Sequence, residues 1–355
     1  MAPTATRHWV LSEKPTGHPV ISGPNATFQL GTKLLPQIQE GEVLVKVLYF
    51  SNDPAQRIWI DPRIPPDRLY TTPVEEGQTM ASSAAVAEVI ESESESLPVG
   101  TLISAMTGWS EYAVVRAGEC IPLVPVDGLE VTDWAGLFGT AGVTAYYGLV
   151  DIVQAGPSDA VVISGAAGAV GSAAVQIAKN MLGCKRVIGI AGTDEKCRWV
   201  ESLGADLCLN YKKTSFKDDL RKTTEGFVEV FFDNTGGEIL DLMLELVKRD
   251  GRVAACGAIT DYNSPDAWGI KNWYHVIAMR LQIQGFVVLD ALVGGRWSEI
   301  TGILIEGYQQ DKLRVTDNGT TVVATEFEDI PKTWMRLFEG QSTGKLLTKL
   351  VKSVK

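Results

Sequence analysis

The sequence predicts an α/β protein in which a doubly wound parallel sheet is inserted into a mostly-β domain. The chain has 355 residues, more than one hydrophobic core usually holds, so two domains are expected. Between residues 127 and 307, apolar β-branched runs alternate with helical patterns, as they do around a parallel sheet. Both flanking regions read as short strands separated by polar loops. We therefore expect one domain from residues 1–126 and 308–355, and a second from residues 127–307.

The first region is expected to consist mainly of strands. The run that starts at Gly41 alternates apolar and polar residues until Asp53, and residues 84–90 and 112–115 predict further strands. The final segment, from about Val315, has a similar sequence pattern, with two predicted strands around an amphipathic stretch. The two ends of the chain should therefore fold together.

The central region predicts at least four strands with helices between them. Residues 160–164 form a short, continuous apolar run, which is typical of a strand buried on both faces. The uncharged stretch 160–178 therefore reads as a buried strand, a turn and a helix rather than a membrane span. The other predicted strands are 186–191, 228–234 and 252–259, and the predicted helices are 170–183, 194–204 and 238–251.

Composition narrows the class of protein. The chain carries 43 acidic and 32 basic residues, a formal net charge of −11, which argues against a broad surface for nucleic acid or anionic lipid. Its five cysteines include no C-x-x-C pair and its start has no apolar signal core, so we expect reduced thiols in a cytoplasmic protein. With three histidines, no metal-ligand spacing and no G-x-S-x-G elbow, we expect neither a metal site nor a serine hydrolase.

The strongest local motif is the run Ala166-Ala167-Gly168-Ala169-Val170-Gly171, which follows a predicted strand and opens a predicted helix. It matches the dinucleotide fingerprint G-x-G-x-x-G, except that Ala166 replaces the first glycine. Gly168 lets the backbone approach a pyrophosphate closely, and Gly171 lets the helix pack tightly on the strand. The first amide groups of the helix favour phosphate. We therefore expect a dinucleotide cofactor at residues 167–171.

The end of the second strand of this region favours NADP over NAD. NAD sites commonly place a carboxylate there for the ribose 2′-hydroxyl, but this strand ends Ile190-Ala191-Gly192-Thr193. Gly192 leaves room for a 2′-phosphate, Thr193 can donate a hydrogen bond to it, and Lys196 brings positive charge. Tyr211 follows the next short strand and can close the same site. Taken alone, Lys196 or Lys212 reads more simply as a solvated surface residue; together with the missing carboxylate, they favour NADP.

Several motifs occur together, and their order along the chain is specific. They are Ser51-Asn52-Asp53-Pro54 with Arg57, Glu76–Met80, Gly139–Tyr146, the turn at 166–171, Phe232-Asp233-Asn234 with Gly236-Gly237, Cys256–Ile259 with Tyr262-Asn263, and Gly344-Lys345. This set resembles the zinc-independent medium-chain dehydrogenases/reductases, in the branch of prostaglandin reductases, plant double-bond reductases and curcumin reductases. The resemblance covers nearly the whole chain.

The resemblance implies a GroES-like catalytic domain, a Rossmann cofactor domain and NADPH-dependent reduction of an α,β-unsaturated carbonyl. It implies that Lys196 and Tyr211 contact the 2′-phosphate. The other implied cofactor contacts are Asn234, Cys256, Gly257, Ala258, Ile259, Tyr262, Phe286, Val287, Val288 and Ser342, and the implied substrate contacts are Asn52, Ala55 and Trp109. From the residues alone, Phe286, Val287 and Val288 read as a plain core strand.

The sequence departs from this branch at three places. Ala55 stands where relatives carry a tyrosine that can face the substrate, and Ser342 stands where they carry an asparagine. The loop from Asp61 to Pro73 is long and rich in proline. These departures affect the substrate class and one cofactor contact.

We therefore expect an NADPH-dependent enal and enone reductase that works without zinc on a small molecule. Tyr262 is the candidate donor to the developing enolate oxygen, helped by the ribose 2′-hydroxyl, because a phenol stays protonated at neutral pH. The α-carbon proton comes from Tyr262 or from water. Tyr262 alternatively serves only to position the cofactor. Quinone or carbonyl reduction, and a silent NADPH-binding protein like the structural crystallins, are the alternatives, and we expect a homodimer.

Overall fold

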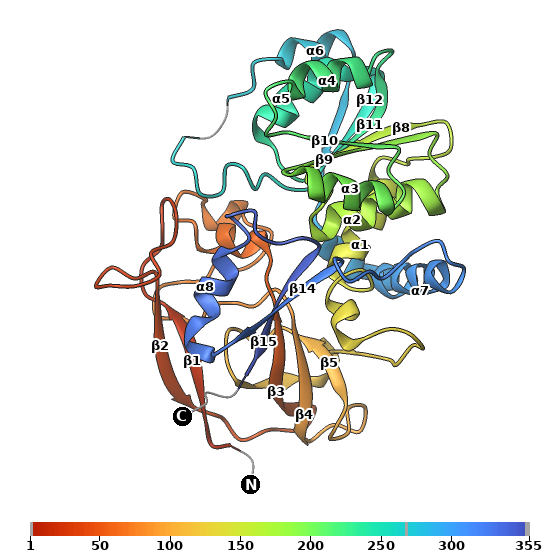
Figure 1. Ribbon diagram of the computed structural model, residues 1–355. Helices are drawn as coiled ribbons and strands as arrows, with labels where there is room; N and C mark the ends of the chain where they lie inside the picture. Colours follow the sequence, from red (N-terminus) through yellow and green to blue (C-terminus); the bar gives the residue numbers. More distant parts are fainter. Residues whose placement is uncertain (1–2, 267–268, 352–355) are drawn as a thin grey trace. The chain divides into compact units, whose positions relative to one another are not determined.

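The computed structural model, which describes residues 3–266 and 269–351, divides into two compact units (Figure 1). Unit 1 contains the residues up to Ala135 and from Thr321 onward, and unit 2 contains Gly136–Thr320. Both boundaries lie further along the chain than the composition of the sequence suggested. Ala135 packs against Val86 and Leu347 in unit 1, whereas the chain after the last helix of unit 2 stays bound to that unit through Arg314.

Unit 2 contains a six-stranded sheet with the order β10-β9-β8-β11-β12-β13, in which all the paired strands are parallel. Its strands are β8 (Ala160–Ile163), β9 (Arg186–Ala191), β10 (Leu207–Asn210), β11 (Val228–Asp233), β12 (Val247–Ala255) and β13 (Gln282–Gly285). Every residue of β8 and β11 is buried, which explains the continuous apolar sequence of β8 and the apolar run Val230–Phe232 in β11. The strand order is that of the doubly wound Rossmann fold, so the predicted fold class is confirmed.

Helices cover both faces of this sheet, with α2 and α3 on one side and α4, α5 and α6 on the other (Figure 1). The helices are α1 (Thr140–Tyr146), α2 (Ala169–Gln176), α3 (Asp194–Ser202), α4 (Phe216–Thr223), α5 (Gly237–Leu246), α6 (Trp273–Ala278) and α7 (Arg296–Gln309). Two π-helical turns, Tyr147–Ile152 and Ile177–Met181, extend α1 and α2, and a 3-10 segment, Val288–Gly295, precedes α7. Among the helices of the described chain, none combines the length and the apolar composition that a bilayer crossing requires.

One predicted helix is shorter than its sequence pattern suggested. The pattern continued to Gly251, but α5 ends at Leu246 and β12 begins at Val247. Val247 is fully buried and pairs in register with Val228 of β11. The gain from burying a β-branched side chain in the sheet outweighs the local helical pattern here.

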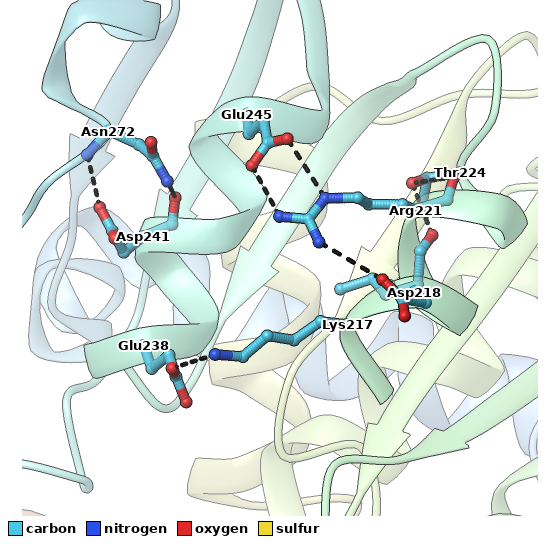
Figure 2. A network of polar contacts seen from close by, with 9 residues as sticks. Lys217, Asp218, Arg221, Thr224, Glu238, Asp241, Glu245 and Asn272 are labelled. Carbon is cyan, nitrogen blue, oxygen red and sulfur yellow. Dashed lines mark hydrogen bonds and ion pairs between the residues drawn. The ribbon is translucent and has the colours of Figure 1, made fainter. Parts of the chain in front are cut away.

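Charged pairs join α4 to α5 on the outer face of unit 2 (Figure 2). The Arg221 guanidinium donates to both carboxylate oxygens of Glu245, at 3.2 Å each, and Lys217 Nζ lies 2.5 Å from Glu238 Oε1. Asp241 of α5 is buried and accepts the backbone amide of Asn272, at 2.8 Å, just before α6. The exposed pairs add little stability, whereas the Asp241 contact anchors the approach to α6.

Unit 1 is mostly β and has the GroES-like architecture. Its main sheet has the order β14-β15-β3-β4-β5-β7 with β6 paired to β3, and β1 and β2 form a separate antiparallel pair. The elements are β1 (Ala5–Leu11), β2 (Phe28–Leu34), β3 (Glu42–Ser51), β4 (Ala85–Ser92), β5 (Leu102–Ala105), β6 (Tyr112–Arg116), β7 (Ile121–Pro122), β14 (Thr320–Thr325), α8 (Ile330–Met335) and β15 (Lys345–Leu350). The pairing of β15 with β3 brings the two ends of the chain into one sheet.

Candidate functional site

The candidate site lies at the carboxyl ends of the strands of unit 2. β8 and β11 are neighbours at the centre of the sheet, and the order of connections reverses between them. In open α/β sheets, ligands bind outside the carboxyl ends of the strands at this switch point. The predicted cofactor residues of unit 2 follow β8, β9, β10, β11, β12 and β13, so they lie along one edge of the sheet.

The turn after β8 has the geometry of a phosphate-binding loop. Gly165 has a positive φ of 59°, which supplies the tight turn that the fingerprint assigns to its first glycine. A Cβ atom on Gly171 would lie 2.2 Å from the Gly165 carbonyl oxygen, so only glycine fits there. Gly168 is exposed just before α2, where the first amide groups of that helix point outward. Ala167, Ala169 and Val170 complete this turn.

The segments after β9 and β10 form a cradle beside the start of α3. A Cβ atom on Gly192 would lie 3.2 Å from the Tyr211 ring, so glycine lets this half-exposed ring lie against the backbone. Thr193 Oγ1 caps α3 by accepting the amide of Lys196 at 3.1 Å. Burial lowers the pKa of Lys196, and the positive charge of Lys212 lowers it further. Two lysines that repel each other in this way would be stabilised by an anion between them.

The loops after β11 and β12 pack closely against each other. A Cβ atom on Gly257 would lie 3.1 Å from the Asn234 carbonyl oxygen and 3.4 Å from the Tyr262 hydroxyl. The Tyr262 hydroxyl accepts the backbone amide of Ala258 at 3.2 Å, so the loop from Cys256 through Ile259 closes on itself. An accepted hydrogen bond polarises the O–H bond, which makes this hydroxyl a better donor.

Two groups behind these loops have perturbed pKa values. Burial raises the pKa of Cys256 to about 12, and the nearby Asp233 carboxylate contributes to that rise, so the thiol stays neutral. Burial also raises the pKa of Asp233, while hydrogen bonds from Thr235, Gly236 and Ser164 oppose the rise. The Cys256 thiol therefore lacks the character of a nucleophile at neutral pH.

The segment after β13 is not a core strand, so that interpretation of Phe286, Val287 and Val288 is wrong. β13 ends at Gly285, its four residues are exposed, and the three following residues are half buried at the carboxyl edge. The Phe286 ring lies 6.1 Å from the Phe232 ring, centroid to centroid. Its position beside a residue of β11 brings this segment toward the switch point.

The structure places two of the three predicted substrate residues in the interior of unit 1. Trp109 is fully buried, with ring centroids 5.1 Å from Phe28 and 5.7 Å from Trp334, so it packs in the core of unit 1, and its substrate contact stays a prediction. Asn52 is 2% exposed, and its amide donates to Thr348 Oγ1 at 3.0 Å and to the Leu346 carbonyl at 3.3 Å, so it joins β3 to β15. Ala55 is half buried, and the substrate roles of these residues stay predictions.

Ser342 and the proline-rich loop also belong to unit 1. Ser342 is half buried in the segment before β15, and its cofactor contact remains a prediction. Within residues 61–73, the Asp61 carboxylate accepts from Arg63 at 2.7 Å, and the Trp59 indole donates to the Tyr70 hydroxyl at 3.1 Å. The loop is therefore fastened by side chains, despite its length.

Three residues at the carboxyl ends of β8 and β11 were not predicted from the sequence to belong to the site. Gly165 makes the left-handed turn, and Ser164 and Asp233 are hydrogen-bonded to each other at 2.8 Å across the switch point. Asp233 carried a signal, because a polar residue that ends a strand after the apolar run Val230–Phe232 sits where parallel sheets bind ligands. Its partner Ser164 is distant in the sequence and could not be paired with it from the pattern.

Comparisons with known proteins agree with this architecture. A family model described as the N-terminal domain of oxidoreductases matches residues 7–123, and one described as zinc-binding dehydrogenase matches residues 169–305. Prostaglandin reductase 1 of Bos taurus is 35% identical over an alignment 353 residues long, which covers 97% of this chain and 98% of that protein. The NADPH-dependent curcumin reductase of Escherichia coli (strain K12) is 30% identical, over 97% of this chain and 96% of its own.

A solved structure shows the same similarity in three dimensions. CurA from Vibrio vulnificus, in complex with NADPH, superimposes with a TM-score of 0.85 at 30% identity, over 98% of this chain and 99% of that one. Both units are therefore shared with that protein. Since the similarity extends along nearly the full length of each relative, the chain belongs to the zinc-independent medium-chain dehydrogenases/reductases, in the branch that contains the prostaglandin and curcumin reductases.

Proposed function

We propose that this protein is an NADPH-dependent reductase of the carbon–carbon double bond of α,β-unsaturated aldehydes and ketones. The observation that carries the proposal is its full-length similarity to proteins named prostaglandin reductase and NADPH-dependent curcumin reductase. The carboxyl edge of unit 2 supports it independently, since its turns and charges suit a phosphorylated dinucleotide.

The residues at this edge fit NADPH. A 2′-phosphate suits the cradle of Gly192 and Tyr211, where Lys196 and Lys212 add positive charge. The pyrophosphate suits the turn at residues 167–171, because Gly168 is exposed at the start of α2. Asn234, the segment 256–262 and residues 286–288 are proposed to hold the ribose and nicotinamide end.

The proposed chemistry needs one hydrogen-bond donor on the protein. When bound, NADPH supplies a hydride to the β-carbon of the unsaturated carbonyl. The Tyr262 hydroxyl donates to the carbonyl oxygen as negative charge develops there, and its bond from the Ala258 amide strengthens this donation. The enolate then takes a proton at the α-carbon, from Tyr262 or from water, to give the saturated carbonyl.

NADPH oxidation with three kinds of acceptor tests this proposal. A 2-alkenal or enone should be consumed and give the saturated carbonyl by mass spectrometry, whereas a saturated ketone should give no turnover. Turnover with a quinone alone would instead identify a quinone reductase on this scaffold. Tight NADPH binding without turnover on any acceptor would identify a silent binding protein.

The proposed mechanism uses hydrogen bonds rather than zinc to polarise the substrate. Within the described part of the chain, no three His, Cys, Asp or Glu side chains lie close enough together to hold a metal ion. Exhaustive chelation should therefore leave the reductase activity intact. Stoichiometric zinc in the purified protein, with activity lost when it is removed, would contradict the mechanism.

We also propose that the protein is a homodimer joined through β13. This strand is at the end of the sheet order, and all four of its residues are exposed. Two large apolar side chains near it in the sequence are unusually exposed, Tyr274 at 73% and Val293 at 78%. An exposed edge strand can pair with its own copy about a two-fold axis and cover such side chains.

Sedimentation velocity tests the dimer directly. The combined variant Tyr274→Asp and Val293→Asp should be monomeric at a concentration at which the unmodified protein is dimeric, because charge in a covered apolar face is costly. Val99→Asp, at a position in unit 1 that is 65% exposed, is the matched control and should remain dimeric. A monomeric unmodified protein would refute the proposal.

A further inference from the structure

We infer that Asp233 is a positioning residue that fixes the loops at the nicotinamide end of the cofactor site. The inference rests on the cofactor placement proposed above. Asp233 is 1% exposed at the last position of β11, so it does not contact a ligand directly. It acts through the residues that its carboxylate and its carbonyl hold.

The Asp233 carboxylate organises the loop that carries Asn234. Its Oδ1 atom accepts the amides of Thr235 and Gly236, each at 3.0 Å, and Oδ2 accepts the Gly236 amide at 3.2 Å. These contacts turn the chain back over the end of the strand directly after Asn234. A buried carboxylate that accepts several amides fixes a loop strongly, because each freed amide would be left unsatisfied.

The same carboxylate ties this loop to β8 across the switch point. Ser164 Oγ donates to Asp233 Oδ1 at 2.8 Å and accepts the Asn234 amide at 2.9 Å. The Asn234 side-chain amide donates to the Ser164 carbonyl at 2.7 Å. Ser164 is next to Gly165, so the phosphate-binding turn and the Asn234 loop share one hydrogen-bond network.

The backbone of Asp233 holds the third loop. Its carbonyl accepts the amides of Cys256 at 2.9 Å and Gly257 at 3.1 Å. The Ala258 amide then donates to Tyr262, as described above. Three segments that are distant in the sequence therefore converge on this one residue, and all three are proposed to meet the cofactor.

Another buried carboxylate on the same strand provides a matched control. Glu229 is 9% exposed near the amino end of β11 and accepts from Lys185 at 2.7 Å, Lys248 at 2.8 Å and the Ala160 amide at 2.7 Å. The strand separates it from every proposed cofactor residue. Loss of Glu229 should therefore affect folding stability alone.

The test compares affinities for NADPH and for adenosine 2′-monophosphate, a probe that lacks both the pyrophosphate and the nicotinamide end. Titration calorimetry should show that Asp233→Asn raises the Kd for NADPH about tenfold or more and changes the Kd for the monophosphate by less than about twofold. Ser164→Ala should show the same split with a smaller rise, because it removes only the bridge between the loops. Lys196→Ala should weaken both ligands, and Glu229→Gln should weaken neither.

The affinities test whether Asp233 positions these loops, and the thermal midpoints show whether each variant is folded. Unchanged NADPH affinity in both Asp233→Asn and Ser164→Ala would overturn the inference. Equal weakening of both ligands by these variants would also overturn it, because it would show a general structural role. Failure of the proposed activity appears separately, as no enone turnover by the unmodified protein, and leaves the binding comparison fully informative.

Discussion

In unit 2, buried carboxylates have different partners at the two ends of the parallel strands. The amino edge is the side of the sheet where the strands begin, and the carboxyl edge is the side where they end. At the amino edge, Glu229 is neutralised by two lysines, and Asp159 is paired with Arg252 at 2.7 Å. At the carboxyl edge, Asp233 accepts from backbone amides and hydroxyl groups, and the described residues include no ion pair to it. A buried carboxylate that is paired with cations stabilises the fold. A buried carboxylate that accepts hydrogen bonds from neutral donors fixes the conformation of the loops around it.

The lysines at the two edges also differ in their charged neighbours. Lys185 and Lys248 at the amino edge lie on a carboxylate, but Lys196 and Lys212 at the carboxyl edge repel each other. Repulsion between like charges costs stability unless an anion binds between them. This difference supports our proposal that a phosphorylated ligand binds at the carboxyl edge.

The largest expected effect tests whether the carboxyl edge carries the chemistry. If the Tyr262 hydroxyl stabilises the enolate, Tyr262→Phe should lower kcat about 10²–10³-fold, the usual cost of losing one such donor. The dissociation constant for NADPH should then change little. Single-turnover reduction of an enone, measured beside NADPH affinity, checks both quantities.

The other role of Tyr262 gives a different result in the same variant. If the hydroxyl only holds the cofactor or its loop, NADPH affinity should fall and saturating NADPH should restore most of kcat. Full kcat at saturation would remove Tyr262 from the chemistry and leave water or the ribose hydroxyl as the donor.

The second prediction concerns the amino edge and its dependence on pH. Burial raises the pKa of Glu229, but hydrogen bonds from Lys185 and Lys248 outweigh this effect and bring the pKa to about 2. The folded-state pKa is thus below its unfolded value, so the stabilisation is present above about pH 4.5 and is lost as the pH falls toward 2. Because the lysines are half exposed and screened, we expect about 2 kcal/mol at pH 7.

Urea unfolding of Glu229→Gln measures this contribution. The variant should be less stable than the unmodified protein at pH 7, and the difference should shrink steadily below about pH 4.5. NADPH affinity should stay the same at neutral pH. A stability difference that does not change with pH would mean that packing, rather than the paired charge, makes the amino edge stable.

The sequence predicted the scaffold of both edges better than their polar contacts. The strand 186–191 was predicted with its observed bounds, because β-branched residues buried on both faces leave a clear pattern. The end of α5 was misjudged, because pairing of Val247 with Val228 is a long-range effect. The packing of Trp109 against Phe28 and Trp334 was not predicted, because no local pattern reveals contacts between residues so distant in the sequence.

The third prediction asks whether Lys196 belongs to a ligand site or to the surface. Lys196→Ala should raise the Kd for NADPH about tenfold, or about 1.4 kcal/mol, and leave that for NADH nearly unchanged. The matched control is Lys213→Ala, because Lys213 is exposed and already paired with Asp194 at 2.8 Å. Equal loss for both cofactors would remove Lys196 from the 2′-phosphate site.

The smallest expected effect tests whether burial explains why the ion pairs at the amino edge contribute to the free energy of unfolding. Arg221 and Glu245 form a well-aligned pair on the outer face of unit 2, but both are substantially exposed, at 43% and 34% of their side chains (Figure 2). Arg221→Ala should therefore lower the free energy of unfolding by less than about 1 kcal/mol, and the loss should vanish at high salt. Lys222→Ala on the same helix is the control for helix propensity. Urea unfolding at pH 7 could show that Arg221→Ala lowers the free energy of unfolding as much as Glu229→Gln does. In that case good geometry alone would explain both pairs, and burial would not distinguish the amino edge from the open surface.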